Sequence, residues 1–518
     1  MSDPSSDMTE NQYRELCVAC DRLLLASDST TERAAISWLH VIREHPVFLR
    51  GYTDLVRSEA SVKGAVREWR RKLRYTAGWL RQLGRASLAE GLPWYGAKNL
   101  AGPIDVLFVS HLLNASQAGA NDFYFGRLPD GLAERRRSVV ISLINHSGEP
   151  GTTLAARWNH SAVPRIILSS SLGFKGEIAL FRRLKNESFR LRRLAARGAL
   201  DLFQRVAAPA SQEAMSGGAR SALRLGAQIN ALVSALKPKA VVVTYEGHAW
   251  ERVAFAAARQ ARPAIRCIGY QHAALFRLQH AIRRNLGYPY DPDYVLTAGA
   301  LGKRQLENAA GLRGVQRGFM KTPAVPTAPG AVKVVSCARR RCLVLPEGIL
   351  SECHLLFEFA LHCAKLCPEI EFVWRLHPLV TFKSLISANH NLRIRPPNIR
   401  LSFGAIESDL PGCSWALYRG TTAIVQAVGA GLQPIYLRIP GEMTIDPLYE
   451  LGGWKASVET AEDFRKAVIT TAENPKDNQR ASEQESVRAY CQNMFEPFDV
   501  DVLSNLIDGC EPKHVPKN

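Results

Sequence analysis

Residues 371–378 read Glu-Phe-Val-Trp-Arg-Leu-His-Pro, which predicts a buried strand that ends in a basic turn. The Phe-Val-Trp run consists of residue types favoured in strands. Pro378 has no N–H to donate and biases His377 towards an extended conformation, so regular strand pairing should stop there. Ligands of open α/β sheets bind just beyond the carboxyl ends of the strands, where Arg375 and His377 could donate hydrogen bonds to a phosphate. The alternative is a strand end with a solvated arginine and a structural histidine.

The composition is that of a soluble globular protein that favours anionic partners. The chain has 518 residues, 46% of them hydrophobic and 22% charged, and a formal net charge of +18. This length suits two or three domains. The charge favours a nucleotide, a nucleic acid or an anionic lipid surface. The 11 scattered cysteines and the lack of a signal-peptide core or a membrane-spanning run predict a cytoplasmic protein.

Strands alternate with helices in two series, which predicts two α/β domains with parallel sheets. The first series has expected strands at residues 104–111, 138–144, 165–168, 240–244, 267–270 and 294–297. The second series has expected strands at 342–345, 371–376, 399–402, 415–418 and 433–437. Together these predict an N-terminal helical region (1–100), a first Rossmann-like domain (101–322), a second Rossmann-like domain (335–475) and a C-terminal helical tail (476–518). A linker rich in proline separates the two domains, which would face each other across a cleft.

Two polar turns follow strands of the first series. Glu246 stands directly after the expected strand 240–244 and before Gly247, a position that suits a general base. Glu246 could instead cap the following helix, but Glu251 could serve that helix equally well. The second turn follows the strand at 267–270 and includes His272, which is either a substrate ligand or a structural histidine. The neighbouring residues that could line the cleft are Tyr245, His248 and Gln271.

The second series carries a candidate anion site at residues 419–422, Arg-Gly-Thr-Thr. Gly420 gives backbone freedom, Thr421 is the expected N-cap, and Arg419 and Thr422 complete the group of phosphate-binding candidates. The alternative is an ordinary capped helix. After the first strand of this series, Glu347 and Ser351 are further cleft candidates, and Ser351 could cap the next helix.

The sequence predicts no cofactor and no bound metal. It contains no Walker A loop, GxGxxG turn, GxSxG elbow or HExxH helix. Asp291 and Asp293 have the D-x-D spacing that can hold a metal-bound nucleotide sugar. They precede a strand instead of following one, and Pro292 indicates a plain turn.

Two basic segments contain interleaved aromatic or apolar residues, at 63–85 and 177–197. Such helices are attracted to anionic membrane surfaces. For 63–85 the alternative is a solvated face whose aromatic residues pack on the next domain.

These motifs resemble those of GT-B glycosyltransferases that use CMP-activated acidic sugars, the bacterial sialyltransferases and Kdo transferases. That family has an acidic D/E-D/E-G motif, an HP motif and a Ser/Thr-rich turn, which Tyr-Glu-Gly at 245–247, His-Pro at 377–378 and Gly-Thr-Thr at 420–422 match in order. The chain is also similar to bacterial surface-carbohydrate biosynthesis proteins through Tyr-Glu-Gly-His at 245–248 and Tyr-Gln-His at 270–272.

The resemblance covers roughly residues 104–475 and implies an inverting, metal-independent transfer from a CMP-sugar to a glycan or lipid-linked glycan acceptor. It implies that Glu246 deprotonates the acceptor, that His377 hydrogen-bonds the CMP phosphate, and that Thr421 and Thr422 hold the same phosphate. The enzyme would work in the cytoplasm, where its basic helices would contact the inner membrane face. Tyr245 replaces the first acidic residue of the motif, so the base lies among Glu246, His248 and His272.

Other functions remain open from sequence alone. The enzymatic rivals are a transferase of polyol phosphate from a CDP-glycerol-type donor and a transferase that uses a UDP-sugar. The rivals of another class are a catalytically inactive scaffold and a protein that binds nucleic acid or another anionic surface. No nucleic-acid-binding module is recognisable, which argues against nucleic acid.

Overall fold

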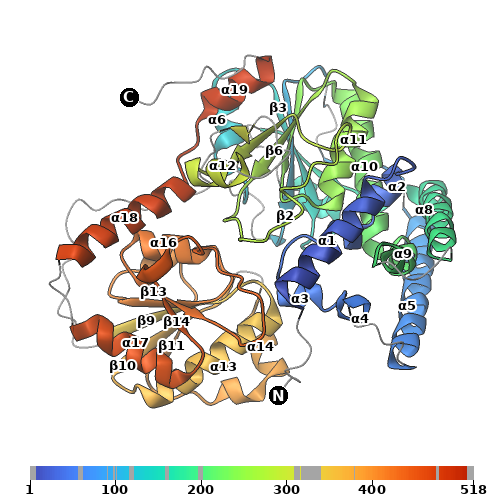
Figure 1. Cartoon of the computed structure of the whole chain (residues 1–518). Coiled ribbons are helices and arrows are strands. Elements are labelled where there is room, and N and C mark those ends of the chain that lie inside the picture. The colour runs from blue at the N-terminus through green and yellow to red at the C-terminus, as the bar shows by residue number, and fades with distance from the viewer. Residues whose placement is uncertain are drawn as a thin grey trace.

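Two β-sheets, each covered by helices, form two α/β domains in the computed structural model (Figure 1). The structure describes residues 8–56, 62–89, 91–96, 100, 102–115, 122–157, 163–196, 202–307, 315–316, 340–377, 380–473 and 478–509. The predicted fold class, α/β with two Rossmann-like units and an N-terminal helical region, is confirmed.

The first sheet has the strand order of a doubly wound α/β fold. Its strands are β1 (Trp94–Tyr95), β2 (Val106–Leu112), β3 (Val139–Asn145), β4 (Arg165–Leu168), β5 (Ala240–Thr244), β6 (Arg266–Gln271), β7 (Tyr294–Thr297) and β8 (Val315–Gln316). They lie in the order β1-β4-β3-β2-β5-β6-β7-β8, and only β1 is antiparallel to its neighbour. The direction in which strands are added reverses between β2 and β5, and such a switch point is where open α/β sheets bind ligands.

Helices cover both faces of this sheet, which explains why its strands are almost wholly apolar. Five of the domain's helices are α6 (Leu128–Glu134), α7 (Gly151–Ala156), α10 (Gly217–Leu236), α11 (Ala249–Ala261) and α12 (Ala300–Glu307). All five residues of β5 are buried. Val241 and Val243 pack in one core cluster with α10 and α11, and Val242 packs in a second cluster on the other face.

The N-terminal helices share a core with two helices of the first domain. They are α1 (Glu10–Leu24), α2 (Thr31–Ala34), the 3-10 helix η1 (Ser37–His40), α3 (Pro46–Leu49), α4 (Thr53–Val56) and α5 (Val62–Ser87). Leu16, Leu23 and Leu39 pack in one buried cluster with residues of α8 (Gly173–Ala195) and α9 (Leu202–Glu213). The helical region is therefore built onto the first domain.

The second sheet is wholly parallel and repeats the doubly wound order. Its strands are β9 (Arg340–Leu345), β10 (Ile370–Arg375), β11 (Ile399–Ser402), β12 (Trp415–Tyr418), β13 (Gln433–Leu437) and β14 (Ala456–Val458). They lie in the order β11-β10-β9-β12-β13-β14, so the switch point is between β9 and β12. β10 is the strand predicted from the 371–378 stretch, and Phe372, Val373 and Trp374 are fully buried.

The second domain's helices are short except for three. They are α13 (Leu350–Leu366), α14 (Phe382–Ala388), η3 (His390–Arg393), α15 (Ile406–Asp409), α16 (Ala423–Gly429), η4 (Gly452–Trp454), α17 (Ala461–Glu473) and α18 (Asn478–Met494). Residues 317–339, which include most of the predicted linker, lie outside the described residues.

After the second domain the chain returns to the first (Figure 1). Residues of α18 pack with α16, and α19 (Val500–Asp508) then packs beside α6. Leu503, Leu506 and Ile507 of α19 belong to a core cluster of the first sheet. The predicted C-terminal tail thus contributes to both domains.

The cysteines that the structure describes are all free thiols. Cys17 and Cys20, which are three positions apart on α1, are both buried. Among the helices that the structure describes, none has the length and apolar character needed to cross a membrane.

Candidate functional site

The turn after β5 is shaped by Glu251, whose carboxylate holds the backbone of residues 246–248. One oxygen of Glu251 accepts N–H bonds from Glu246 at 2.9 Å, from Gly247 at 2.8 Å and from His248 at 2.8 Å. Burial raises the pKa of Glu251 to about 7, although His248 and these backbone donors oppose the rise. Glu251 therefore serves the start of α11, and Glu246 is not needed as its cap. The sequence had left Glu246 and Glu251 as alternatives for this position.

Glu246 and His248 form a carboxylate–imidazole pair at the carboxyl edge of the first sheet. His248 Nε2 lies 3.4 Å from Glu246 Oε2, and the two side chains are 38% and 27% exposed. Burial favours the neutral carboxyl, but His248, His272 and Arg43 outweigh it and hold the pKa of Glu246 well below its usual range. Burial opposes charge on His248 too, but Glu246 and Glu251 raise the pKa of His248. The pair therefore favours an ionised carboxylate beside an imidazolium.

A group of imidazole and aromatic rings surrounds this pair at the ends of the neighbouring strands. His111, near the end of β2, lies 2.9 Å from His146 Nε2 through its Nδ1. The ring of Tyr124 lies edge-on to both His111 and His272, with centroids 5.5 Å and 4.6 Å away. Burial, with His146 and His272 nearby, lowers the pKa of His111 to about 3, so His111 is neutral. Neutral imidazoles and a tyrosine can exchange hydrogen bonds with sugar hydroxyls.

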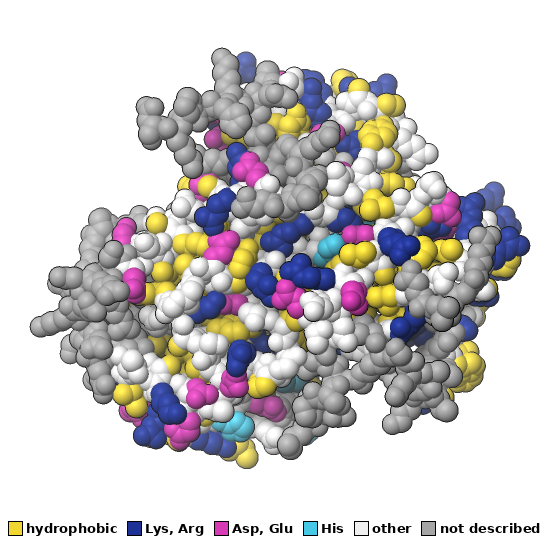
Figure 2. Space-filling model, viewed as in Figure 1, with side chains coloured by type: hydrophobic (Ala, Val, Ile, Leu, Met, Phe, Trp, Pro, Cys, Tyr) yellow, Lys and Arg dark blue, Asp and Glu magenta, His cyan; other side chains and the backbone are white. Residues whose placement is uncertain are grey.

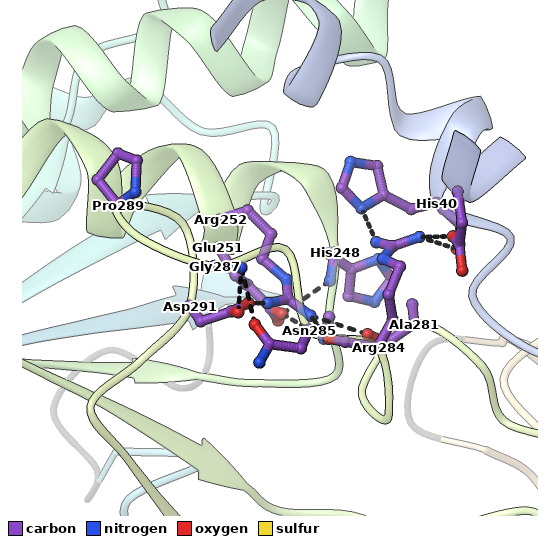
Figure 3. Close-up of polar contacts among 12 residues, drawn as sticks. His40, His248, Glu251, Arg252, Ala281, Arg284, Asn285, Gly287, Pro289 and Asp291 are labelled. Carbon is purple, nitrogen blue, oxygen red and sulfur yellow. Dashed lines mark hydrogen bonds and ion pairs between the residues drawn. The ribbon is translucent and has the colours of Figure 1, made fainter. Parts of the chain in front are cut away.

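Buried arginines hold the segment that follows β6 against the Glu246 turn (Figure 3). Arg252 donates to the carbonyls of Ala281 at 2.9 Å and Arg284 at 2.8 Å, and it forms an ion pair with Asp291. Arg284 in turn donates to His40 Nδ1 at 2.7 Å. Gly247 has a φ of +85°, and an added Cβ would overlap the carbonyl of Ala281. The turn at residues 246–248 and the segment that follows β6 therefore pack closely, with no room for a side chain at position 247.

Asp291 and Asp293 form ion pairs with buried arginines of α11. Asp291 is paired with Arg252, and Asp293 lies 2.6 Å from Arg259 and accepts the N–H of Cys267 at 2.7 Å. Both carboxylates are thus used in holding the chain, in keeping with the turn predicted there.

The second domain presents Glu347, Gly348, His377 and Gly420 together at its switch point. A Cβ on Gly348 would lie 2.7 Å from the His377 ring, and a Cβ on Gly420 would overlap the Glu347 carboxylate. Glu347 and Gly420 are buried, and His377 is partly exposed. The sequence predicted this meeting of the strand ends after β9, β10 and β12. Pro378 lies outside the described residues.

Glu347 also connects the second domain to the N-terminal helical region. Its Oε1 lies 3.2 Å from His45 Nε2, and its Oε2 lies 3.4 Å from Arg43 Nη2. Burial would raise the pKa of Glu347, but His45, Arg43 and Arg419 lower it. Arg43 acts on Glu246 as well, so one guanidinium lies within electrostatic range of the candidate base in the first domain and of Glu347 in the second.

Two arginines that were expected to bind a phosphate are engaged elsewhere. Arg419 is buried and forms ion pairs with Glu352 and Glu442, which neutralise its charge. Arg375 donates to the carbonyl of Gly404 at 2.7 Å and to Asp409 at 3.0 Å, beyond the end of β11. Neither Arg375 nor Arg419 is therefore available to a phosphate as predicted. A buried carboxylate has lost its hydration and needs a charged partner, and the arginine at the strand end supplies it.

The two caps predicted in this domain have different outcomes. Thr422 occupies the N-cap position of α16 but makes no side-chain cap bond, whereas the Thr421 hydroxyl accepts the N–H of Ala423 at 3.3 Å and so makes the capping contact expected of it. α13 begins at Leu350 after an Ile349 N-cap, so Ser351 is an exposed residue of its first turn and caps nothing.

Two predicted cleft residues belong to the core. The Tyr245 side chain is fully buried under Arg252, whose guanidinium lies 5.1 Å from the ring centroid. Gln271 is buried, donates to the carbonyl of Ala273 and accepts the N–H of Ala298 at 3.3 Å. Tyr245 therefore stands where it cannot reach a substrate, and the carboxylate absent at this position leaves Glu246 as the acidic residue of the motif.

Only one group of metal-ligand type was found among the described residues, His45, Glu347 and Glu352, whose ligand atoms lie within 4.8 Å of one another. The guanidinium of Arg43 accompanies Glu347 and that of Arg419 accompanies Glu352. Each carboxylate of this set already has a guanidinium partner, so a metal ion would have to displace an arginine.

Sequence reasoning missed Arg43, His45, His111, His146 and Tyr124. His111 is the last residue of the strand predicted at 104–111. Its position at a strand end could have marked it as a candidate site residue. Arg43 and His45 gave no such signal, because they belong to a helical region and their partner Glu347 lies 304 and 302 residues away.

No protein-family model matches the chain, and no curated protein is significantly similar to it in sequence. Solved structures with similar folds include the glycosyltransferase SnogD from Streptomyces nogalater, with 16% identity and a TM-score of 0.45, over 79% of this chain and 100% of that one. A putative UDP-N-acetylglucosamine 2-epimerase from Listeria monocytogenes has 12% identity and a TM-score of 0.46, over 80% of this chain and 100% of that one. The UDP-GlcNAc 2-epimerase from Neisseria meningitidis bound to UDP-GlcNAc has 13% identity and a TM-score of 0.43, over 79% and 99%. The fold assignment itself rests on the two doubly wound strand orders of this chain.

Proposed function

We propose that this protein is a GT-B-type glycosyltransferase of bacterial surface polysaccharide biosynthesis. In this proposal it transfers an acidic sugar, a nonulosonic acid or Kdo, from a CMP-sugar to a glycan acceptor with inversion. The observation that carries the proposal is a pair of strand-end sites on two doubly wound sheets. The Glu246–His248 pair lies on one sheet, Gly348, His377 and Gly420 lie on the other, and Arg43 is within electrostatic range of both carboxylates.

On the acceptor side, Glu246 takes the proton. The acceptor hydroxyl oxygen attacks the anomeric carbon, its O–H proton passes to the Glu246 carboxylate, and the bond from the anomeric carbon to the phosphate oxygen breaks. His248 orients the carboxylate through the 3.4 Å contact. In this proposal His272 binds an acceptor or donor oxygen, because its ring lies beside Tyr124 and Tyr124 lies beside His111 at the same sheet edge.

On the donor side, the CMP phosphate leaves with the electron pair and gains negative charge. His377 donates a hydrogen bond to it, and fixed donors of this kind stabilise such developing charge. Gly348 and Gly420 leave room for the phosphate beside the backbone, and Thr421 and Thr422 lie next to it. Arg375 and Arg419 hold the frame of this site through their own carboxylate partners and do not bind the donor.

The proposal includes the partners and the place of action. The donor is a nucleotide sugar and the acceptor is a glycan on a lipid carrier. The reaction takes place in the cytoplasm, at the inner face of the cytoplasmic membrane. It uses no cofactor and no metal.

The test is a donor panel measured on the purified protein. We expect CMP to bind more tightly than UDP, CDP or GDP in calorimetry, and CMP-sugars to be hydrolysed slowly to CMP. His377→Ala should weaken CMP binding by about tenfold or more, because a hydrogen bond to a charged group contributes about 1.5–3 kcal/mol. His362→Ala, which removes an exposed histidine of α13, is the matched control and should bind CMP normally.

The base is tested separately. Glu246→Gln should reduce transfer by about 10²–10⁴-fold and leave CMP binding intact, because a positioned base contributes to the rate and not to donor affinity. Glu134→Gln, at an exposed position of α6, should transfer normally. Preferential turnover of a UDP-sugar or a CDP-polyol would replace the donor assignment, and binding of no nucleotide would overturn the proposed function.

A further inference from the structure

Helix α5 presents apolar side chains to solvent along the face that points away from the protein. Val66, Trp69, Leu73 and Leu80 are 47%, 62%, 50% and 66% exposed. Their spacing of three, four and seven residues places them on one side of the helix. Over these 14 residue steps the stripe is about 21 Å long.

The opposite face of α5 is what holds the helix to the first domain. Trp79 is buried and its indole N–H donates to the carbonyl of Met215 at 3.0 Å. The Tyr75 hydroxyl donates to Glu213 at 2.6 Å, and Gln82 donates to the carbonyl of Ser170 at 3.0 Å. Tyr75 and Trp79 therefore pack on the first domain, which is one of the two interpretations that the sequence left open for residues 63–85. Packing does not account for the outward stripe.

Exposed basic side chains accompany the stripe on α5 and on the adjacent helix α8. On α5 the exposed cations are Arg70, Lys72, Arg74, Arg81 and Arg85. On α8 they are Lys175, Arg182, Arg183, Lys185, Arg190, Arg192 and Arg193. The acidic residues of α8 are Glu177 and Glu187, which are buried and bound to Arg224 and Arg33. Phe174 and Phe189 of α8 are also half-exposed.

The two basic helices form one surface although they are about a hundred residues apart in the chain. α5 packs on α8, where the Trp79 and Phe181 rings meet edge-on with centroids 5.1 Å apart. Figure 1 places both helices at the edge of the molecule beside α9, and Figure 2 shows Lys and Arg side chains gathered at that edge. We name this surface, the exposed faces of residues 66–85 and 174–193, the basic–apolar face.

We infer that the basic–apolar face docks on an anionic lipid bilayer, with α5 lying in the plane of the interface. The stripe would enter the boundary between headgroups and acyl chains, while the flanking cations meet lipid phosphates. A nucleic acid would also attract the cations, but its phosphate backbone offers nothing to a row of Val, Trp and Leu side chains. The inference deepens the proposed function, since it supplies the surface that would bring the enzyme to a lipid-linked acceptor.

The test is co-sedimentation of the full chain with vesicles. We expect binding to vesicles of equal parts phosphatidylcholine and phosphatidylglycerol at low salt, little binding to phosphatidylcholine alone, and release as salt is raised. Replacing Arg182, Lys185 and Arg192 with Gln should weaken partitioning by about a hundredfold, because each cation near the surface contributes about fivefold. The matched control replaces Arg400, Arg438 and Arg465 of the second domain, which are 49%, 58% and 49% exposed, and should bind normally.

A second variant distinguishes binding to a lipid bilayer from binding to any polyanion. Trp69→Ser with Leu80→Ser keeps the charge and should still weaken vesicle binding by about tenfold or more. No binding at low salt would overturn the inference. So would binding that the apolar variant leaves unchanged and that duplex DNA competes away, because the face would then be a general polyanion surface.

Transfer to a soluble acceptor distinguishes this inference from the proposed function. The vesicle variants should leave that transfer unchanged, because their residues lie outside the candidate site. If the wild-type protein transfers to a soluble acceptor but does not bind the anionic vesicles, the docking surface alone is overturned. If it binds the vesicles but transfers to no acceptor, the proposed function alone is overturned.

Discussion

Gly247 occupies a backbone position that accepts no side chain. Its φ is +85° and an added Cβ would overlap the Ala281 carbonyl. We therefore expect Gly247→Ala to lower the free energy of unfolding by about 2 kcal/mol or more and to reduce transfer, because the strain moves Glu246 and His248. Gly84→Ala in α5 is the control. A Cβ there meets nothing within 4 Å, so stability should stay equal or rise by about 0.5–1 kcal/mol. Urea unfolding of both variants measures these free energies. A Gly247→Ala variant as stable as the wild type would show that the turn can shift to accept a side chain.

Single residues also mark the limit of reading a site from sequence. The positions after β5, β9 and β12 were predicted correctly, because parallel strands bring their carboxyl ends to one edge. What each side chain does there was less predictable. Arg419 has Glu352 and Glu442 as partners, 67 residues before it and 23 after it. The Tyr245 side chain points into the core, whereas that of Glu246 is partly exposed. The local sequence pattern predicts neither the partners of Arg419 nor these two orientations.

The segment between β6 and β7 depends on buried arginines and not on regular secondary structure. Arg252→Met should free residues 281–291 while the rest of the domain stays folded, because it leaves Asp291 and two carbonyls without their partner. Removing one partner of a buried ion pair costs about 3–5 kcal/mol. We expect faster hydrogen exchange in peptides from 276–293 and unchanged exchange in 340–377. Arg127→Met, at a side chain that is 73% exposed, is the control and should exchange like the wild type.

Among the elements, long apolar strands were predictable and short ones were not. β4, β5, β7, β11, β12 and β13 have the predicted bounds. β1 has two residues and β14 has three, too few to form a periodic pattern, and they exist because a neighbouring strand offers them partners. α9 was missed for another reason, since it contains Pro209. Its packing against α1 outweighs the local preference of proline.

At the scale of the whole molecule, Glu347 connects the second domain to the helical region. We expect Glu347→Gln to lower the free energy of unfolding by about 3 kcal/mol at pH 7, because Arg43 loses its ionic partner. The folded state lowers the pKa of Glu347, so this stabilisation is complete above the unfolded value of about 4.5 and is lost as pH falls through the folded value. The difference in unfolding free energy should therefore shrink below about pH 4.5.

Two comparisons make that experiment specific. Glu369→Gln changes an exposed carboxylate of the same domain and should match the wild type at every pH. A Glu347→Gln difference that stays constant from pH 7 down to pH 4 would mean that the charge of Glu347 contributes nothing to the contact.

The place of α19 has a consequence for how the protein is made. Leu503, Leu506 and Ile507 fill one face of the first sheet, yet the ribosome adds them after the whole second domain. At about 5–20 residues per second, roughly 10–40 s separate the end of the first sheet from the arrival of α19. During that time the nascent first domain has an uncovered apolar face, and aggregation or chaperone binding competes there with folding.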